Sequence, residues 1–358
     1  MKAGRGSPVD EAVLGALRRK TGHHQTVHCL GERLGLSPQS VTAAIRELHR
    51  QGYEIEAHPG LGYRLLAAPD RLSRLEIGPV LRTRFMGRPV YSYGSVRSTN
   101  RVALELSRKG APEGTLVLAE EQLAGRGRLG RTWHSPPGLG LWMSLILHPR
   151  VPADRVFQVA ICGALAVAET VSDRFPLDVK VKWPNDVLIG GAKLAGVLVE
   201  SQWNGPDARG VVVGIGINVN HRASDFPRHL HHRATSLRME LGRAVDRTGL
   251  LGDLLACFEN IYLQFHDQGL EPFLDRWRQL SAVLGQPIRI QIGRQTVRGL
   301  AAGIDAQGAL LLTEENGDRH RFLAGDVSVT KIGTTEKFSS SRTPTGDKLS
   351  QGRRTCGL

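Results

Sequence analysis

The most distinctive stretch of the chain reads Gly125-Arg126-Gly127-Arg128-Leu129-Gly130-Arg131-Thr132, three arginines interleaved with three glycines. It matches by letter both a dinucleotide-binding fingerprint and a near P-loop, but those motifs open a helix. Here Trp133-His134-Ser135-Pro136 follows and then a strand, so no helix terminus faces a phosphate. Glycines let backbone approach a ligand, and guanidinium groups bind phosphate and carboxylate. We therefore predict a mobile loop that closes over an anion; the alternative is a solvated basic loop.

Two further clusters lie downstream. They are Lys182-Trp183-Pro184-Asn185-Asp186, which continues at Ala192-Lys193-Leu194-Ala195-Gly196-Val197-Leu198-Val199-Glu200, and Gly214-Ile215-Gly216-Ile217-Asn218-Val219-Asn220. Lys193 begins an apolar strand, where a lone cation seldom lies without a partner. Gly214 and Gly216 lie on one face of a strand and either leave space for a ligand or mark a bulge. Trp183-Pro184 is interpreted as a corner of the core.

Around these clusters the pattern alternates between strands and helices. Strands are expected at 89–93, 116–121, 140–147, 179–182, 196–202 and 211–218, and helices at 100–109, 157–174, 250–270 and 272–284. Residues 286–331 alternate apolar and polar residues between glycine turns, which predicts a small β-barrel.

The N-terminal part has a different organisation. Helices are expected at 9–20, 27–34 and 38–50, followed by strands at 53–58 and 63–66. Ser37 caps the third helix with Pro38 in its first turn. Val41, Ile45 and Leu48 form its apolar stripe. The layout is that of a winged helix-turn-helix.

Composition limits the function classes. Of 358 residues, 47 are Lys or Arg and 34 Asp or Glu, a net charge of +13 that favours nucleic acid, phosphates or acidic proteins as partners. No apolar run is long enough for a membrane span, and the N-terminus lacks the apolar stretch of a secretory signal. Four isolated cysteines exclude a zinc ribbon and favour a reducing cytosol: Cys29, Cys162, Cys257 and Cys356.

We divide the chain into five parts: a DNA-binding domain at 1–66, a linker at 67–79, a catalytic domain at 80–284, a C-terminal domain at 285–333 and a disordered tail at 334–358. His221, His229, His231 and His232 crowd one segment, which we interpret as a surface loop rather than a metal site.

Taken in order, Ser98-Thr99-Asn100, the Gly125–Arg131 loop with Trp133, Lys182–Asp186, Lys193–Leu198 and Gly214–Asn218 resemble the biotin–protein ligases, specifically the class that is also a biotin-operon repressor. The resemblance covers about residues 8–331. It implies a multidomain α+β fold: an N-terminal winged helix-turn-helix, a central α/β ligase domain of the biotin/lipoyl-ligase type, and a C-terminal SH3-like β-barrel.

The resemblance also implies a carbon–nitrogen ligase that works in two steps in the cytoplasm. Biotin and MgATP give biotinyl-5′-AMP, and biotin then passes to a lysine of the biotin carboxyl carrier protein of acetyl-CoA carboxylase. Cations must offset the repulsion between two anions, and a closing loop must exclude water. A homodimer formed on biotinyl-AMP binding and repression at operator DNA are further implications.

Residue roles follow from the same resemblance. Lys193, Arg126 and Arg128 are the catalytic candidates. Biotin would be bound by Ser98, Thr99, Asn100, Gln122, Gly125, Arg126, Gly127, Arg128, Lys193, Gly196, Leu198, Gly214 and Gly216. The nucleotide would be bound by Arg128, Arg131, Trp133, Lys182, Asn185 and Asn218. DNA would be bound by Gln39, Ser40, Thr42, Arg46, Arg50 and Arg64. No residue is assigned to a protein-bound metal.

Three alternatives stay open at this point. The chain could be a lipoate-type acyl ligase of the same fold, or a DNA-binding biotin sensor whose ligase activity has decayed. The winged helix could also be retained only to pack on the ligase. Arg101 departs from the family pattern, which often has Gln there. Ser98 could cap the helix that follows it, bind ligand, or do both.

Overall fold

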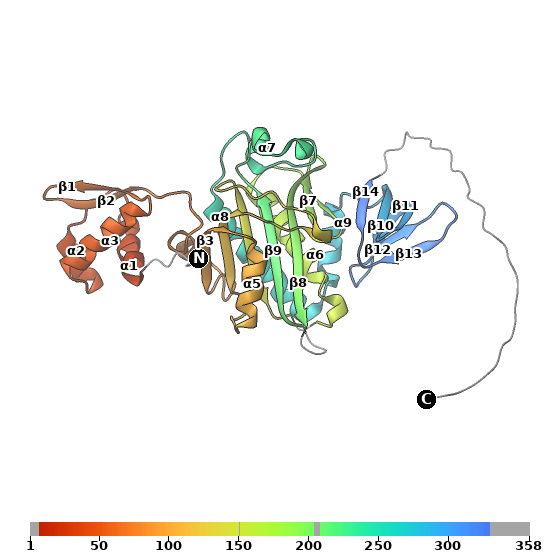
Figure 1. Cartoon of the computed structure of the whole chain (residues 1–358), viewed down its shortest axis with the longest axis horizontal. Coiled ribbons are helices and arrows are strands. Elements are labelled where there is room, and N and C mark those ends of the chain that lie inside the picture. The colour runs from red at the N-terminus through yellow and green to blue at the C-terminus, as the bar shows by residue number, and fades with distance from the viewer. Residues whose placement is uncertain (1–6, 150, 204–207, 330–358) are drawn as a thin grey trace, which may run out of the picture.

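The computed structural model describes residues 7–149, 151–203 and 208–329. Figure 1 shows three units in a row: a small helical unit at one end, a large central sheet with its helices, and a smaller sheet at the other end. The tail expected at 334–358 lies outside the described residues.

The N-terminal unit is a winged helix. Its elements are α1 (Pro8–Arg19), α2 (Val27–Leu34), α3 (Pro38–Arg50), β1 (Glu54–His58) and β2 (Gly62–Ala67). Ser37 caps α3 by accepting a hydrogen bond from the amide of Ser40, and the predicted stripe of α3 is buried in the core of this unit. Gly62 has φ +94°, and a Cβ there would lie 2.2 Å from the carbonyl oxygen of Gln25, so the wing requires glycine at this turn.

The central sheet has seven strands in the order β3-β4-β5-β9-β8-β7-β6, with only the β3–β4 pair parallel. The strands are β3 (Val90–Val96), β4 (Leu116–Gln122), β5 (Gly140–Leu147), β6 (Val179–Lys182), β7 (Asp186–Ile189), β8 (Ala192–Trp203) and β9 (Ala208–Asn218). Strand β7 was not predicted, and β8 begins at Ala192 rather than Gly196. Gly190 and Gly191 both have positive φ, so they form the two-residue turn that pairs β7 with β8.

Helices cover both faces of this sheet (Figure 1). Val117, Ile146 and Val212 pack on α5 (Thr99–Arg108), whereas their neighbours along the strands pack with α6 (Gln158–Arg174) and α8 (Arg247–Gln268). The short α4 (Arg74–Ile77) and α7 (Leu237–Leu241) lie in connecting segments. The helix expected at 272–284 is shorter, α9 (Leu274–Leu280), because Ser281 is already extended.

The C-terminal unit is a five-stranded antiparallel sheet in the order β13-β12-β11-β10-β14. Its strands are β10 (Pro287–Ile292), β11 (Gln295–Ile304), β12 (Leu310–Thr313), β13 (Arg319–Phe322) and β14 (Asp326–Val329). Trp183 is buried, as predicted, and its indole N–H donates to the carbonyl oxygen of Gly308 at 3.0 Å. This contact joins the C-terminal unit to the central sheet. No helix among the described residues has the length and apolarity needed to cross a membrane.

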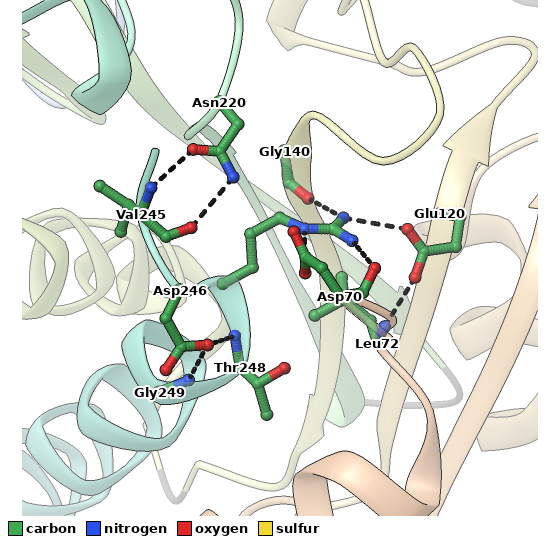
Figure 2. A network of polar contacts seen from close by, with 10 residues as sticks. Asp70, Leu72, Glu120, Gly140, Asn220, Val245, Asp246, Thr248 and Gly249 are labelled. Atoms are coloured by element: carbon green, nitrogen blue, oxygen red, sulfur yellow. Dashed lines mark hydrogen bonds and ion pairs between the residues drawn. The ribbon is translucent and has the colours of Figure 1, made fainter. Parts of the chain in front are cut away.

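Arg247 is the first residue of α8 and is fully buried. Its guanidinium donates to the side chain and carbonyl of Asp70 (3.0 and 2.9 Å), to the Glu120 carboxylate (2.9 Å) and to the Gly140 carbonyl (3.2 Å). Glu120 in turn accepts from the amide of Leu72 at 2.6 Å. Figure 2 shows these partners converging from the segment after β2, from β4 and from the start of β5. Arg247 therefore holds the segment that follows the winged helix against β4 and β5 of the central sheet.

We expect Arg247→Met to lower the free energy of unfolding of the central unit by about 3 kcal/mol, because it leaves the mostly buried Glu120 carboxylate without its cation. Arg101→Met, which breaks an exposed ion pair with Glu105, is the control and should cost less than about 1 kcal/mol. Urea unfolding followed by tryptophan fluorescence measures both. Equal losses in the two variants would show that the buried network adds no stability.

Candidate functional site

A cavity of about 730 Å³ lies on the α5 side of the central sheet and extends to the edge of the C-terminal sheet. Its size is that of a small-molecule site. Apart from Gly125, the lining includes every residue that the sequence assigned to biotin or nucleotide: Ser98, Thr99, Asn100, Gln122, Arg126, Gly127, Arg128, Arg131, Trp133, Lys182, Asn185, Lys193, Gly196, Leu198, Gly214, Gly216 and Asn218. Residues up to 120 positions apart in the sequence, from Ser98 to Asn218, thus meet at one place.

Glycines on β8 and β9 make the room for this cavity. Gly196 and Gly216 are register partners, and Gly214 pairs with Leu198, so the ladder is unbroken there and the bulge alternative is wrong. A Cβ at Gly216 would lie 2.6 Å from the indole nitrogen of Trp133. One at Gly214 would lie 2.1 Å from Oδ1 of Asn100. The missing side chains leave space that Asn100 and Trp133 enter.

Each arginine of the loop has a specific partner. Arg128 donates to Oδ1 of Asn185 and to the carbonyl of Gly325, both at 3.1 Å, and burial lowers the pKa of its guanidinium. Arg131 donates to the Asp326 carboxylate at 3.2 Å. This hydrogen bond raises the pKa of Arg131 and lowers the pKa of Asp326. Arg128 and Arg131 therefore hold the loop against the C-terminal sheet, although the side chains of Arg126 and Arg131 stay exposed.

Arg126, the remaining arginine of the loop, lies 3.6 Å from the Glu200 carboxylate.

Lys193 pairs with Asp186, as expected for a cation at the start of an apolar strand. Its ammonium lies 2.5 Å from Oδ1 of Asp186 and 5.2 Å from the centre of a Trp133 ring. Asp186 belongs to the quoted Lys182–Asp186 cluster, although the sequence analysis gave it no role. The cavity therefore holds a cation that is already oriented by a carboxylate and an aromatic face.

The biotin candidates near α5 form a hydrogen-bonded group. The amide of Thr99 donates to Oε1 of Gln122 at 2.9 Å, and the hydroxyl of Thr99 lies 3.1 Å from the same oxygen. Nε2 of Gln122 donates to the hydroxyl of Ser135 at 3.0 Å. Ser98 occupies the N-cap position of α5 but makes no capping hydrogen bond, so the capping alternative is wrong. Arg101 instead pairs with Glu105 along the helix surface.

Two segments of the cavity wall were missed by the sequence analysis. Residues between β9 and α7, including Phe226, Leu230 and Arg233, lie on one side; Arg289 and Asp326–Ser328 of the C-terminal sheet lie on another. The first segment is tied to Lys193, whose amide donates to the carbonyl of Arg233 at 2.8 Å. Neither segment carries a local sequence motif. Their part in the site is recognised only from the contacts that they make with Lys193 and Arg131 in the folded structure.

Comparison with known proteins gives a family match for each of the three units. The biotin/lipoate A/B protein ligase family matches residues 93–218, the biotin protein ligase C-terminal domain matches 283–329, and an HTH domain matches 11–64. The bifunctional ligase/repressor BirA of Bacillus subtilis is 41% identical over 80% of this chain and 89% of its own length. The chain belongs to the BirA family of bifunctional ligase/repressors.

Other members of the family are similar over much of the chain. BirA of Escherichia coli is 32% identical over 84% of this chain and 91% of its own. Among solved structures, the biotin protein ligase of Aquifex aeolicus in complex with biotin and ATP is 28% identical with a TM-score of 0.60. That comparison covers 67% of this chain and 99% of the Aquifex chain.

Two of the three arginines assigned to DNA in the winged helix are paired with glutamates. Gln39 and Arg46 of α3 are exposed, and Thr42 is half-buried with its hydroxyl on the carbonyl of Pro38. Arg50 pairs with Glu47. In the wing, Arg64 donates to the Glu56 carboxylate at 2.9 Å.

Ser40, the remaining DNA candidate, has its hydroxyl 2.9 Å from that of Ser37.

His221 is the exception to the predicted histidine-rich surface loop, in which His229, His231 and His232 are exposed. It is fully buried, stacks on Phe226 with ring centres 4.8 Å apart, and meets Trp142 edge-on. Neither ring nitrogen has a hydrogen-bond partner among the described residues. Burial lowers the pKa of His221 to about 4, so the ring is neutral at physiological pH. It anchors the start of the segment that closes one side of the cavity.

The depressed pKa of His221 predicts acid sensitivity. Between pH 6.5 and pH 4 the unfolded state binds a proton that the folded state excludes, so stability falls as pH decreases through this window. The expected loss from pH 7 to pH 5 is about 2 kcal/mol. We expect His221→Phe to remove this share of the pH dependence in urea unfolding. Parallel pH profiles for the variant and the parent would contradict the assignment.

Proposed function

We propose that the protein is an ATP-dependent biotin–protein ligase that also represses transcription. The observation that carries the ligase proposal is the single cavity that Lys193 and the loop arginines line together with Thr99 and Gln122. An anion-binding end and a neutral hydrogen-bonding end suit biotin, which has a carboxylate at one end and a ureido ring at the other. Relatives named biotin–[acetyl-CoA-carboxylase] ligase support the same substrate.

In the first step, an oxygen of the biotin carboxylate forms a bond to the α-phosphorus of ATP. The bond from that phosphorus to the bridging oxygen breaks, and pyrophosphate leaves. We assign Lys193 to the carboxylate and α-phosphate, and Arg126 and Arg128 to the charge that develops between them. Arg131, Trp133, Lys182, Asn185 and Asn218 are assigned to the nucleotide.

In the second step, the amine of a lysine on a biotin carboxyl carrier domain attacks the carbonyl carbon of the adenylate. An amide forms, AMP leaves, and the amine loses a proton. The loop from Gly125 to Thr132 would exclude water, which would otherwise hydrolyse the mixed anhydride.

Mg²⁺ fits this site as a companion of the triphosphate. Residues 7–149, 151–203 and 208–329 contain no group of three or more His, Cys, Asp or Glu arranged to hold a metal. Mg²⁺ commonly keeps its waters and binds through substrate phosphates and one or two carboxylates. Asp186 and Asp326, on the cavity wall, are the candidate carboxylates.

The remaining assignments are parts of the same proposal. We place the protein in the cytoplasm, since its isolated cysteines suit a reducing compartment. The division into a DNA-binding unit at 1–66 and a ligase unit at 80–284, and the formation of a homodimer on biotinyl-AMP binding, are proposed with it.

The ligase proposal is tested by mass spectrometry of a biotin carboxyl carrier domain incubated with the protein, biotin and MgATP. We expect one added biotinyl group. We expect Lys193→Ala to slow adenylate formation by about 10²–10³-fold while part of the biotin binding remains, because Lys193 meets charge that develops in the chemical step. A carrier without biotin would contradict the proposed function, and an unimpaired Lys193→Ala would contradict the role of Lys193.

Repression rests on the winged helix. An α3 laid in the major groove would place its N-terminal residues, Gln39, Ser40 and Thr42, at base edges. Phosphate contacts fall to Arg46, Arg50 and Arg64. Because Arg50 and Arg64 are already paired with glutamates, Arg46 is the phosphate contact that needs no exchange among the described side-chain pairs.

We expect specific, salt-sensitive binding to an inverted repeat upstream of biotin-synthesis genes, strengthened by biotinyl-AMP because two weak half-sites must act together. Arg46→Ala should reduce the salt slope by about one unit per half-site. Fluorescence anisotropy with the native upstream DNA and a scrambled duplex measures this, with Arg101→Ala as the control. Equal affinity for both duplexes, with and without biotinyl-AMP, would leave the winged helix no role in DNA recognition.

A further inference from the structure

Glu200 on β8 ends the quoted Ala192–Glu200 cluster but was given no role, and its carboxylate contacts two of the site's segments. Oε2 accepts a hydrogen bond from Nδ2 of Asn100 at 2.8 Å, and Oε1 lies 3.6 Å from the Arg126 guanidinium. Asn100 is in the first turn of α5, which packs on β4, β5 and β9. One side chain therefore links the helix and the glycine-arginine loop.

Asn100 connects Glu200 to polar groups in the interior. It is buried, and its Oδ1 lies 2.6 Å from the hydroxyl of Ser144, itself fully buried on β5. The Ser144 hydroxyl also lies 2.8 Å from the hydroxyl of Thr99, which contacts Gln122. A continuous chain of polar groups thus runs from Glu200 to the residues assigned to the ureido ring.

The direction of the protons in this chain depends on Glu200. An ionised carboxylate only accepts hydrogen bonds, so Asn100 turns its Nδ2 toward Glu200 at 2.8 Å and its Oδ1 toward Ser144. The carbonyl of Leu198, 3.4 Å from the same Nδ2, is a second and longer acceptor. Ser144 has a single proton, which Oδ1 of Asn100 then takes. The Ser144 oxygen can accept the Thr99 proton, and Oε1 of Gln122 keeps the amide of Thr99 as a donor.

The far end of the chain then presents acceptors to the cavity. With its proton turned inward to Ser144, the Thr99 hydroxyl has lone pairs left, as does Oε1 of Gln122. The ureido ring of biotin carries two N–H donors, which need such acceptors. If these hydrogen bonds ran in the opposite direction, Ser144 would donate to Thr99. The Thr99 hydroxyl would then donate to Oε1 of Gln122 and occupy the acceptor that a ligand N–H would use.

We propose that Glu200 is a positioning residue for biotin: it fixes the orientation of Asn100 and, through Ser144, makes Thr99 and Gln122 acceptors for the ureido N–H groups. Arg126 balances the charge of Glu200 in the absence of ligand. The inference rests on the proposed ligase function and adds to it a residue that does not touch the substrate.

The test compares the parent with Glu200→Gln, which keeps the shape but can both donate and accept. We expect the Kd for biotin, measured by calorimetry without ATP, to rise about 10-fold or more. The Kd for biotin should change more than the kcat for adenylate formation at saturating biotin, because Arg126 loses its partner whereas Lys193 keeps Asp186. Glu105→Gln makes the same substitution in an exposed carboxylate on α5 that pairs with Arg101, and should leave both values unchanged.

A double variant separates proton direction from mere packing. Asn100→Asp alone places two carboxylates in contact and should weaken biotin binding at least as much as Glu200→Gln. Combined with Glu200→Gln, the new carboxylate at position 100 accepts from both Ser144 and the new amide, so the original direction returns. We expect the Kd for biotin to recover to within about threefold of the parent.

Two results would overturn the inference: a Glu200→Gln protein that binds biotin as the parent does, or a double variant no better than the worse single variant. A parent protein that binds no biotin would instead overturn the proposed function itself, and the inference with it. Thermal unfolding of each variant identifies any that fail to fold, and for those the Glu200→Gln comparison alone decides.

Discussion

Gly196 and Gly216 face each other across the β8–β9 ladder, and the site depends on the space that their missing side chains leave. Trp133 fills part of that space, and its ring supports Lys193. Because Trp133 follows the glycine-arginine loop directly, its insertion also determines where the loop lies. A methyl group at Gly216 would lie 2.6 Å from the indole nitrogen of Trp133. The positions of the loop and of Lys193 therefore both depend on glycine at this place in the sheet.

Charge balance is the second constraint. In the absence of ligand, Lys193 lies against Asp186, Arg126 against Glu200 and Arg131 against Asp326. Each pair offsets the cost of holding a cation in a partly enclosed cavity. Anionic ligands must then replace or share these carboxylates. Asp326 belongs to the C-terminal sheet, so that unit contributes to the balance, and the Trp183–Gly308 contact keeps it in place.

The sequence was most informative where a local pattern has one physical solution. The capped, striped helix at 38–50 and the loop arginines could be predicted from neighbouring residues alone. The β7 strand was missed because it has only four residues and its signal is the following Gly190-Gly191 turn. Asp326 was not found, and Glu200 was quoted at the end of a cluster without a role, because both roles come from the sheets that bring these carboxylates to Arg131 and Arg126. His221 was misjudged, since nothing in a histidine-rich segment shows which ring is buried.

Biotin and ATP are proposed to bind together in this one cavity, over the face of β8 and β9 where Gly196, Gly214 and Gly216 have no side chains. A crystal structure of the protein with both bound tests it most directly. We expect the biotin carboxylate and the α-phosphate within hydrogen-bond distance of Lys193, with the ureido ring at Thr99 and Gln122. Density for either ligand outside the cavity, or a Lys193 ammonium that contacts neither anion, would contradict it.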